Sequence, residues 1–276
     1  MYWRFGVADE EFKLVKAAQA GSHSALEGLV RIIQDRIHRL AMRMLANPDD
    51  ALEATQEILI LVVTKLSTFK GESAFNTWLY RVATNYLLTA RKIQQRDLGL
   101  TFEMFGEDLE SGLVDPAPAA DDVVMLNELR ISCTMAMLLC LDHKHRIAYV
   151  LGDILEFDHS EAAEILEISH ANYRKRLSRA RGEVVAFTAT RCGLANAKAK
   201  CSCPRRLPAA LKARRVDPEQ IRFAAGDAPG YQEVVAMAQK IERELTVLKL
   251  QTATSSLSSP RDFGTSIARI VEGEVH

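Results

Sequence analysis

The sequence predicts an all-α protein in which two helical domains are joined by an acidic linker and followed by a small, mainly helical C-terminal extension. Apolar residues recur at helical spacing through most of the 276 residues, and no strand-like alternation lasts more than a few residues. The overall charge is nearly balanced, with 35 Lys and Arg against 36 Asp and Glu, but it is spread unevenly. Residues 97–128 are acidic, whereas Glu183 is the only acid between Ile168 and Val216. Binding to nucleic acid would therefore depend on local basic patches.

The first domain, residues 9–96, is expected to contain four helices, at 9–20, 22–46, 48–67 and 73–96. Asn47 is an N-cap residue followed by a proline at the first helical position, and Gly71 lies in the break before the fourth helix. The third helix has an apolar face that must be core. Its other face is a polar, acidic stripe, which is either a binding surface or an ordinary solvated face: Asp50, Glu53, Gln56 and Glu57.

The segment from residue 69 to residue 86 combines the groups that single-stranded DNA requires. Aromatic rings can stack on bases, amides and hydroxyls can read base edges, and cations can hold the backbone. The candidates are Lys70, Ser73, Phe75, Asn76, Trp78, Arg81 and Asn85. Core packing is the alternative for the aromatic residues, because Phe75, Leu79, Val82 and Tyr86 follow a helical stripe. Asn76 and Arg81 have no evident packing role, so they are the better candidates for DNA.

Residues 97–122 lack periodicity, are acidic and contain two prolines, so they are expected to form an extended linker. The second domain, residues 123–190, contains two short helices joined by a tight turn near Ile168, which is the pattern of a helix-turn-helix. In the second of these helices Ser169 can cap the start, and Tyr173, Leu177 and Ala180 share a buried stripe. A neighbouring exposed face carries Arg174, Lys175, Ser178 and Arg179, which are candidates for DNA contacts unless the helix is simply a solvated basic one.

The C-terminal extension, residues 191–276, begins with a basic, cysteine-containing stretch and is expected to contain helices near 231–250 and 263–272. Cys192, Cys201 and Cys203 could supply three thiolates to a zinc ion, although no fourth ligand is evident in the tail. A redox-sensing thiol and reduced cysteines packed in a small subdomain are the alternatives. Cys133 and Cys140 lie on an apolar helix and are expected in the core. The basic run 191–215 either adds phosphate contacts or folds back on the acidic linker.

The strings DDALEATQEILILVVTKLSTF and KGESAFNTWLYRVATNYLLTARK, residues 49–92, resemble region 2 of the extracytoplasmic-function group of bacterial sigma factors. The helix-turn-helix follows at the spacing of their region 4, and the extension resembles one found in a subset of the group. The resemblance implies that loop 70–76, with Asn85 behind it, captures a flipped base of the −10 element. It also implies that the stripe on the third helix docks on the polymerase clamp and that the recognition helix reads the −35 element. Two residues depart from the usual sequence pattern of this group: Leu52 stands where an acid is common, and Glu167 stands where the turn usually has glycine.

We therefore expect a sigma factor without catalytic activity that binds core RNA polymerase and promoter DNA, and that an anti-sigma factor or its own extension could inhibit. The rival is a stand-alone helix-turn-helix regulator that does not join polymerase. An enzyme is disfavoured because the sequence has no glycine-rich phosphate loop and no HExxH pair. The chain is expected to need no cofactor, apart from the zinc alternative above. It has no signal peptide and no run of 18 apolar residues, so we expect it in the cytoplasm, without a membrane span.

Overall fold

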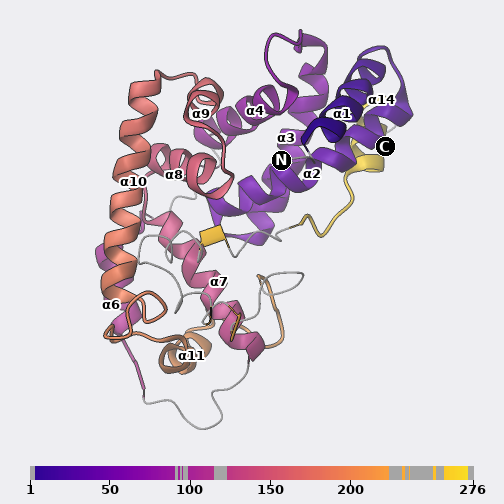
Figure 1. Cartoon of the computed structure of the whole chain (residues 1–276). Helices are drawn as coiled ribbons and strands as arrows, with labels where there is room; N and C mark the ends of the chain where they lie inside the picture. Colours follow the sequence, from indigo (N-terminus) through magenta and orange to yellow (C-terminus); the bar gives the residue numbers. More distant parts are fainter. Residues whose placement is uncertain are drawn as a thin grey trace.

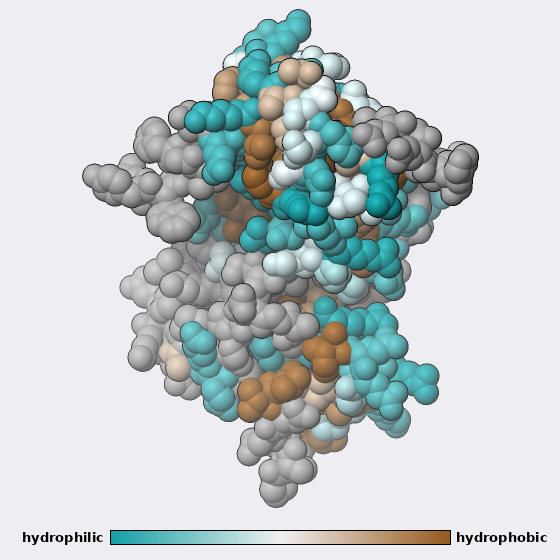
Figure 2. Space-filling model, turned by 90° about the vertical axis from the view of Figure 1, so that its right-hand side faces the viewer, coloured by the Kyte–Doolittle hydropathy of each residue, from teal (hydrophilic) through white to brown (hydrophobic). Residues whose placement is uncertain are grey.

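The computed structural model describes residues 4–90, 93, 95, 99–114, 123–223, 232, 233, 236, 251, 252 and 258–272. Over these residues the chain is helical and contains no strand, only two isolated bridges, so the all-α prediction is confirmed (Figure 1). None of the helices in this part of the chain is long and apolar enough to cross a membrane. On the face drawn in Figure 2 the described residues are mostly hydrophilic, with apolar residues in small groups between them.

The first domain consists of four helices, and capping side chains mark the starts of two of them, α2 and α3. The helices are α1 (Arg4–Gln19), α2 (His23–Leu45), α3 (Pro48–Lys65), which ends in a 3-10 turn (Leu66–Thr68), and α4 (Phe75–Thr89). Asn47 accepts from the backbone N–H groups of Asp49 and Asp50 at 3.0 and 3.1 Å, which satisfies two donors at the start of α3. The four predicted helices are present, but the fourth is shorter than predicted: α4 spans Phe75–Thr89 and not residues 73–96.

The second domain consists of α7 (Val123–Leu139), α8 (His143–Tyr149) with a π-helical turn (Val150–Ile154), α9 (His159–Ile165) and α10 (His170–Arg191). Helices α9 and α10 form the helix-turn-helix. Gly152 in the π-helical turn allows α10 to approach closely, because an added Cβ would lie 2.5 Å from the hydroxyl of Tyr173. That hydroxyl donates to the carbonyl of Ala148 at 3.1 Å.

The two domains share one continuous core. The ring of Tyr80 on α4 packs edge-on against Phe157, which precedes α9, with ring centroids 4.8 Å apart. The guanidinium of Arg146 on α8 donates to the carbonyl of Met44 near the end of α2 at 2.6 Å. In this structure the domains therefore pack against each other, as the neighbouring positions of α4 and α9 in Figure 1 show.

The acidic linker is not extended throughout, and the expectation is wrong for residues 102–110. These residues form helix α6 (Phe102–Glu110), whose buried side chains Phe105 and Leu109 pack near Met137 and Phe187. Thr101 caps α6 by accepting from the backbone N–H of Met104 at 3.2 Å. The short apolar stripe of α6 is interrupted by four acids and Gly106, which is why the sequence pattern did not predict a helix.

Two helices of the C-terminal extension are described. Helix α11 (Cys203–Lys212) packs on α7, and α14 (Gly264–Glu272) packs on α2 and α3. The predicted terminal helix is thus confirmed. Its start is fixed to α2 by Phe263, which is buried and whose N–H donates to the side-chain oxygen of Gln34 at 2.8 Å. The predicted helix at 231–250 lies almost entirely outside the described residues.

Candidate nucleic-acid and polymerase interface

The recognition helix α10 has the two faces that its sequence predicts. Tyr173, Leu177 and Ala180 are buried and hold α10 against α8 and α9. Ser169 caps the helix by accepting from the N–H of Asn172 at 3.2 Å. On the other side the four predicted DNA-contacting residues are all exposed to solvent, over two turns of one helix face: Arg174, Lys175, Ser178 and Arg179. Arg179 also pairs with Glu183 one turn later, at 3.1 Å.

The turn between α9 and α10 is built with Glu167 in the left-handed conformation, at φ 53°. A non-glycine residue in this region costs roughly 1–2 kcal/mol. The turn is closed by backbone bonds from Glu167 N–H to the Glu164 carbonyl at 3.2 Å and from Ile168 N–H to the Ala163 carbonyl at 3.1 Å. The geometry that glycine usually supplies is therefore reached with a strained glutamate.

The aromatic residues of the predicted single-strand site pack against one another. Phe69, Phe75 and Trp78 have ring centroids 5.4–5.7 Å apart. Phe75 is buried and Trp78 half-buried, so in this conformation the core-packing alternative holds for Phe75. Ahead of α4, Lys70 is exposed and Ser73 half-buried.

The polar side of α4 is covered by α9. Thr77 Oγ1 donates to Glu161 at 3.2 Å, Arg81 Nη2 to Glu164 at 2.9 Å, and Asn85 Nδ2 lies 3.5 Å from a carboxylate oxygen of Glu167. Asn76 in turn accepts from Arg36 at 3.4 Å. The view that Asn76 and Arg81 lack an intramolecular role is therefore corrected.

Nothing local in the sequence predicted the contacts between α4 and α9, because the paired residues are 82–84 positions apart. The only signal is the regular spacing of three glutamates, Glu161, Glu164 and Glu167, over two helical turns.

The candidate polymerase-binding stripe lies on the outer side of α3. Gln56 and Glu57 are exposed, while Asp50 and Glu53 are half-buried. The opposite face packs as expected at Ile58, Val62 and Leu66, whereas Leu61 is only half-buried.

The basic start of the extension contacts the acidic linker helix. Asp108 pairs with Arg206 at 2.9 Å and with Arg215. Glu110 pairs with Lys200 at 3.1 Å and with Arg191. Hydrogen bonds from these two cations, that from Lys200 first, hold the pKa of the Glu110 carboxyl below its usual value. Of the two alternatives for the basic run, this structure shows the fold-back on the linker.

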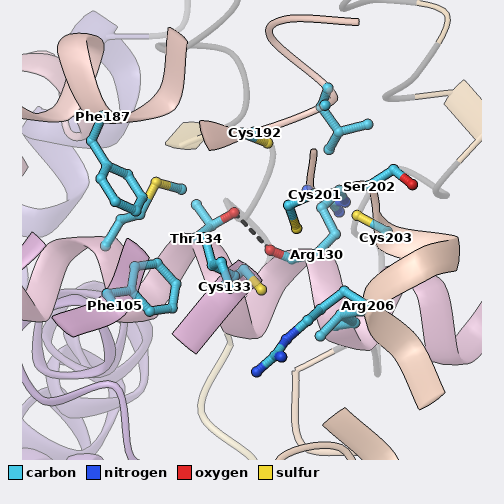
Figure 3. Close-up of a pocket in the computed structure, with 15 residues that line it drawn as sticks. Phe105, Arg130, Cys133, Thr134, Phe187, Cys192, Cys201, Ser202, Cys203 and Arg206 are labelled. Atoms are coloured by element: carbon cyan, nitrogen blue, oxygen red, sulfur yellow. Dashed lines mark hydrogen bonds between the residues drawn. The ribbon is translucent and has the colours of Figure 1, made fainter. Parts of the chain in front are cut away.

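Four cysteines line one pocket between α6, α7, α10 and α11, as Figure 3 shows: Cys133, Cys192, Cys201 and Cys203. Gly193 allows the loop to close here, because its N–H donates to the Cys201 carbonyl at 2.9 Å and an added Cβ would lie 2.6 Å from that oxygen. All five cysteines are free thiols. Burial raises the pKa of Cys133 to about 12 and that of Cys201 to about 11. Among the described residues no three His, Cys, Asp or Glu side chains are placed to hold a metal ion.

Two family models match the chain, one on each side of the linker. Sigma-70 region 2 matches residues 29–97, and Sigma-70 region 4 matches residues 131–184. The chain is 31% identical over 172 residues to the ECF RNA polymerase sigma factor SigW of Bacillus subtilis, a match that covers 61% of this chain and 91% of the relative. It is 29% identical over 173 residues to the ECF RNA polymerase sigma-E factor of Escherichia coli, covering 61% and 88%.

Two solved structures are similar at lower identity. CnrH in complex with the cytosolic domain of CnrY is 21% identical, with a TM-score of 0.44 over 65% of this chain and 96% of that one. The sigma factor RpoE in complex with the anti-sigma factor NepR from Bartonella quintana is 19% identical, with a TM-score of 0.39 over 56% of this chain and 91% of that one. Residues 185–276 lie beyond both family models.

Proposed function

Because the chain belongs to the extracytoplasmic-function sigma factors of the sigma-70 family, which bind core RNA polymerase and direct it to promoters, we propose which of its residues make these contacts. The proposed units are residues 9–96 for the polymerase and the −10 element, 97–122 for the linker, 123–190 for the −35 element and 191–276 for a regulatory extension. The chain itself would catalyse no reaction and would work in the cytoplasm, where its polymerase is.

The −35 element is read by α10. Its exposed face presents Arg174, Lys175, Ser178 and Arg179, which no helix of the described residues covers, and the buried stripe behind fixes the helix against α8 and α9. An arginine that donates two hydrogen bonds to a guanine contributes about 1–3 kcal/mol of discrimination between bases. This exposed basic face, backed by a rigid stripe, is the single observation that carries the assignment of DNA-contacting residues.

The −10 element is bound as a single strand by the loop 70–76 and by α4. Lys70 is exposed and would hold the backbone, and Ser73, Asn76 and Asn85 have the groups for base edges. Arg81 lies between them and would serve as a further cation. Trp78, which is half-buried, supplies the more accessible ring, while Phe75 has to leave its present packing before it can stack on a base.

Core polymerase is bound by α3. Exposure of Gln56 and Glu57 on the outer side of that helix supports this, and Asp50 and Glu53 extend the same stripe. An acidic stripe suits a basic partner surface. An anti-sigma factor would be expected to compete for surfaces of this kind.

The extension requires no cofactor in this scheme. Cys192, Cys201 and Cys203 line the same pocket as Cys133. Zinc binding by these cysteines stays a prediction, and their thiols would have to move closer to one another to coordinate the ion.

The assignments are tested by transcription in vitro with purified core polymerase on a promoter library, using the full chain and a chain lacking residues 191–276. We expect transcription from promoters that share two separated elements. Arg174→Ala and Arg179→Ala should change the preferred −35 bases, while Arg205→Ala in the extension serves as the control. Tight promoter binding by the isolated chain, without association with core polymerase, would instead support a stand-alone regulator.

A further inference from the structure

Three glutamates of α9 and its following turn lie against three donors of α4. The donors recur every four residues and form one row along α4. The acceptors recur every three residues, two of them on α9 and the third in the turn that follows it. We call Glu161, Glu164 and Glu167 the acidic row. The contacts with Thr77, Arg81 and Asn85 measure 3.2, 2.9 and 3.5 Å. The ion pair between Arg81 and Glu164 is the shortest of the three, and its arginine is only partly exposed.

The domains cannot bind both promoter elements in this arrangement. The −10 and −35 elements are about 25 base pairs apart, on the order of 85 Å at 3.4 Å per base pair. Here α9 packs directly on both α4 and α10 (Figure 1), and packed helices lie about 8–10 Å apart. The two DNA-binding helices must therefore separate before transcription starts.

Buried apolar surface supports the closed arrangement beneath the acidic row. Tyr80 packs on Phe157 across the domain boundary, and both rings are buried. The acidic row adds charge at the edge of this contact. Its carboxylates take the donors of Arg81 and Asn85, which a nucleic-acid strand would otherwise use for its phosphates and base edges.

We propose that the acidic row strengthens the closed arrangement of the free protein and blocks single-stranded DNA from α4 until the second domain moves away. This inference rests on the assignment of α4 to the −10 strand. The −35 face of α10 stays exposed in the closed form, so this state can bind duplex DNA but not the opened strand.

Glu167 is the member of the acidic row that combines backbone strain with an interdomain contact. Its backbone is in the left-handed conformation that glycine adopts without strain, yet the residue is a glutamate whose carboxylate faces Asn85. Replacing it with glycine removes the carboxylate and the strain together. Glu167→Gly should therefore open the protein without destabilising the helix-turn-helix, a combination that a purely structural role for Glu167 does not produce.

The test compares two triple variants of the full chain. One is Glu161→Gln with Glu164→Gln and Glu167→Gln. The control makes the same change in net charge at three exposed glutamates away from α4: Glu103, Glu107 and Glu219. Opening is followed by energy transfer between labels placed as unnatural amino acids at the exposed residues Ser67 and Ala171, one in each domain. Binding is followed by the fluorescence anisotropy of a random-sequence, 20-nucleotide single strand.

We expect the first variant to show lower energy transfer and to bind the single strand about five- to tenfold more tightly, while the control changes less than about twofold. Unchanged energy transfer in the first variant would overturn the inference and leave the promoter assignments standing. Reduced transfer without tighter binding would show that the row closes the protein but that α4 does not take the strand. A charge exchange distinguishes loss of this ion pair from misfolding. Arg81→Glu should reduce energy transfer, and the added change Glu164→Arg should restore it.

Discussion

Arg146 on α8 donates to the carbonyl of Met44 across the domain boundary at 2.6 Å. The same guanidinium donates to the carbonyls of Leu138, Leu139 and Leu141 at 2.8–3.0 Å, so it also completes the end of α7. One buried side chain thus closes a helix within the second domain and joins that domain to the first.

Arg146→Lys should destabilise the folded chain by at least about 2 kcal/mol, because an ammonium cannot reach four carbonyls and each buried acceptor left without a donor costs about 1–3 kcal/mol. Urea denaturation followed by circular dichroism measures the change. Lys144→Ala, on the exposed side of α8, is the control and should stay within about 0.5 kcal/mol of the parent. Equal stability of the two variants would contradict a structural role for the four hydrogen bonds.

Gly152→Ala should destabilise the second domain by about 1–3 kcal/mol, because its methyl group would lie 2.5 Å from the Tyr173 hydroxyl and force the recognition helix outward. Thermal melting measures the loss, and duplex promoter binding should weaken with it. Gly182→Ala on α10 is the matched control, since an added Cβ there meets nothing within 4 Å and alanine favours a helix. Combining Gly152→Ala with Tyr173→Phe, which removes the clashing oxygen, should recover part of the stability.

Much of the fold could be predicted because its signals are local. The caps Asn47 and Ser169 mark helix starts, and the stripe of Tyr173, Leu177 and Ala180 fixes which side of α10 is buried. Helix α6 was missed because its apolar stripe is short, and it is stable only through contacts with α7, α10 and the extension.

The contacts between domains could not be predicted from local patterns. Arg81 and Glu164 are 83 residues apart, and each also fits an ordinary solvated helix face. The same holds for the cysteines: the spacing of Cys192, Cys201 and Cys203 is visible in the sequence, but the approach of Cys133 from α7 depends on how the extension folds back.

Neutralising the linker helix should loosen the extension. In the combined variant Asp108→Asn and Glu110→Gln, four ion pairs with the basic run are lost while Phe105 and Leu109 stay in place. We expect amide hydrogen exchange in residues 102–110 to become about 5–20-fold faster, with a smaller difference at high salt because ions screen the parent's pairs. Glu107→Gln, an exposed acid of the same helix without such a pair, should leave exchange unchanged. Faster transcription by the double variant would also show that contact between the extension and the linker helix inhibits the protein.

The buried thiols should react slowly. Burial raises the pKa of Cys133 and Cys140 to about 12, so at pH 8 only about one thiol in 10⁴ is ionised at either site, and the thiolate is the reactive form. Alkylation of the native chain with iodoacetamide should leave both residues unmodified over a time in which the unfolded chain reacts at all five cysteines. Mass spectrometry of peptides measures this. Release of one zinc ion per chain as the thiols react would instead support the zinc alternative.

Acid should destabilise the first domain through His38. Its ring is buried in α2, with Nδ1 3.2 Å from the Thr55 hydroxyl, and burial lowers its pKa to about 4, an effect that Asp35 only partly opposes. Because the folded pKa lies below the unfolded value of about 6.5, the unfolded chain binds the proton first as the pH falls. The stability that neutral His38 provides is therefore complete above pH 6.5 and is lost between pH 6.5 and 4. With these two pKa values, the free energy of unfolding should fall by about 2 kcal/mol between pH 7.5 and pH 5.

Urea denaturation at both pH values measures this loss. The loss should be smaller in His38→Gln, because glutamine takes up no proton, but unchanged in a variant of the exposed His23. Equal pH dependence in His38→Gln and the parent would assign the acid sensitivity to other groups.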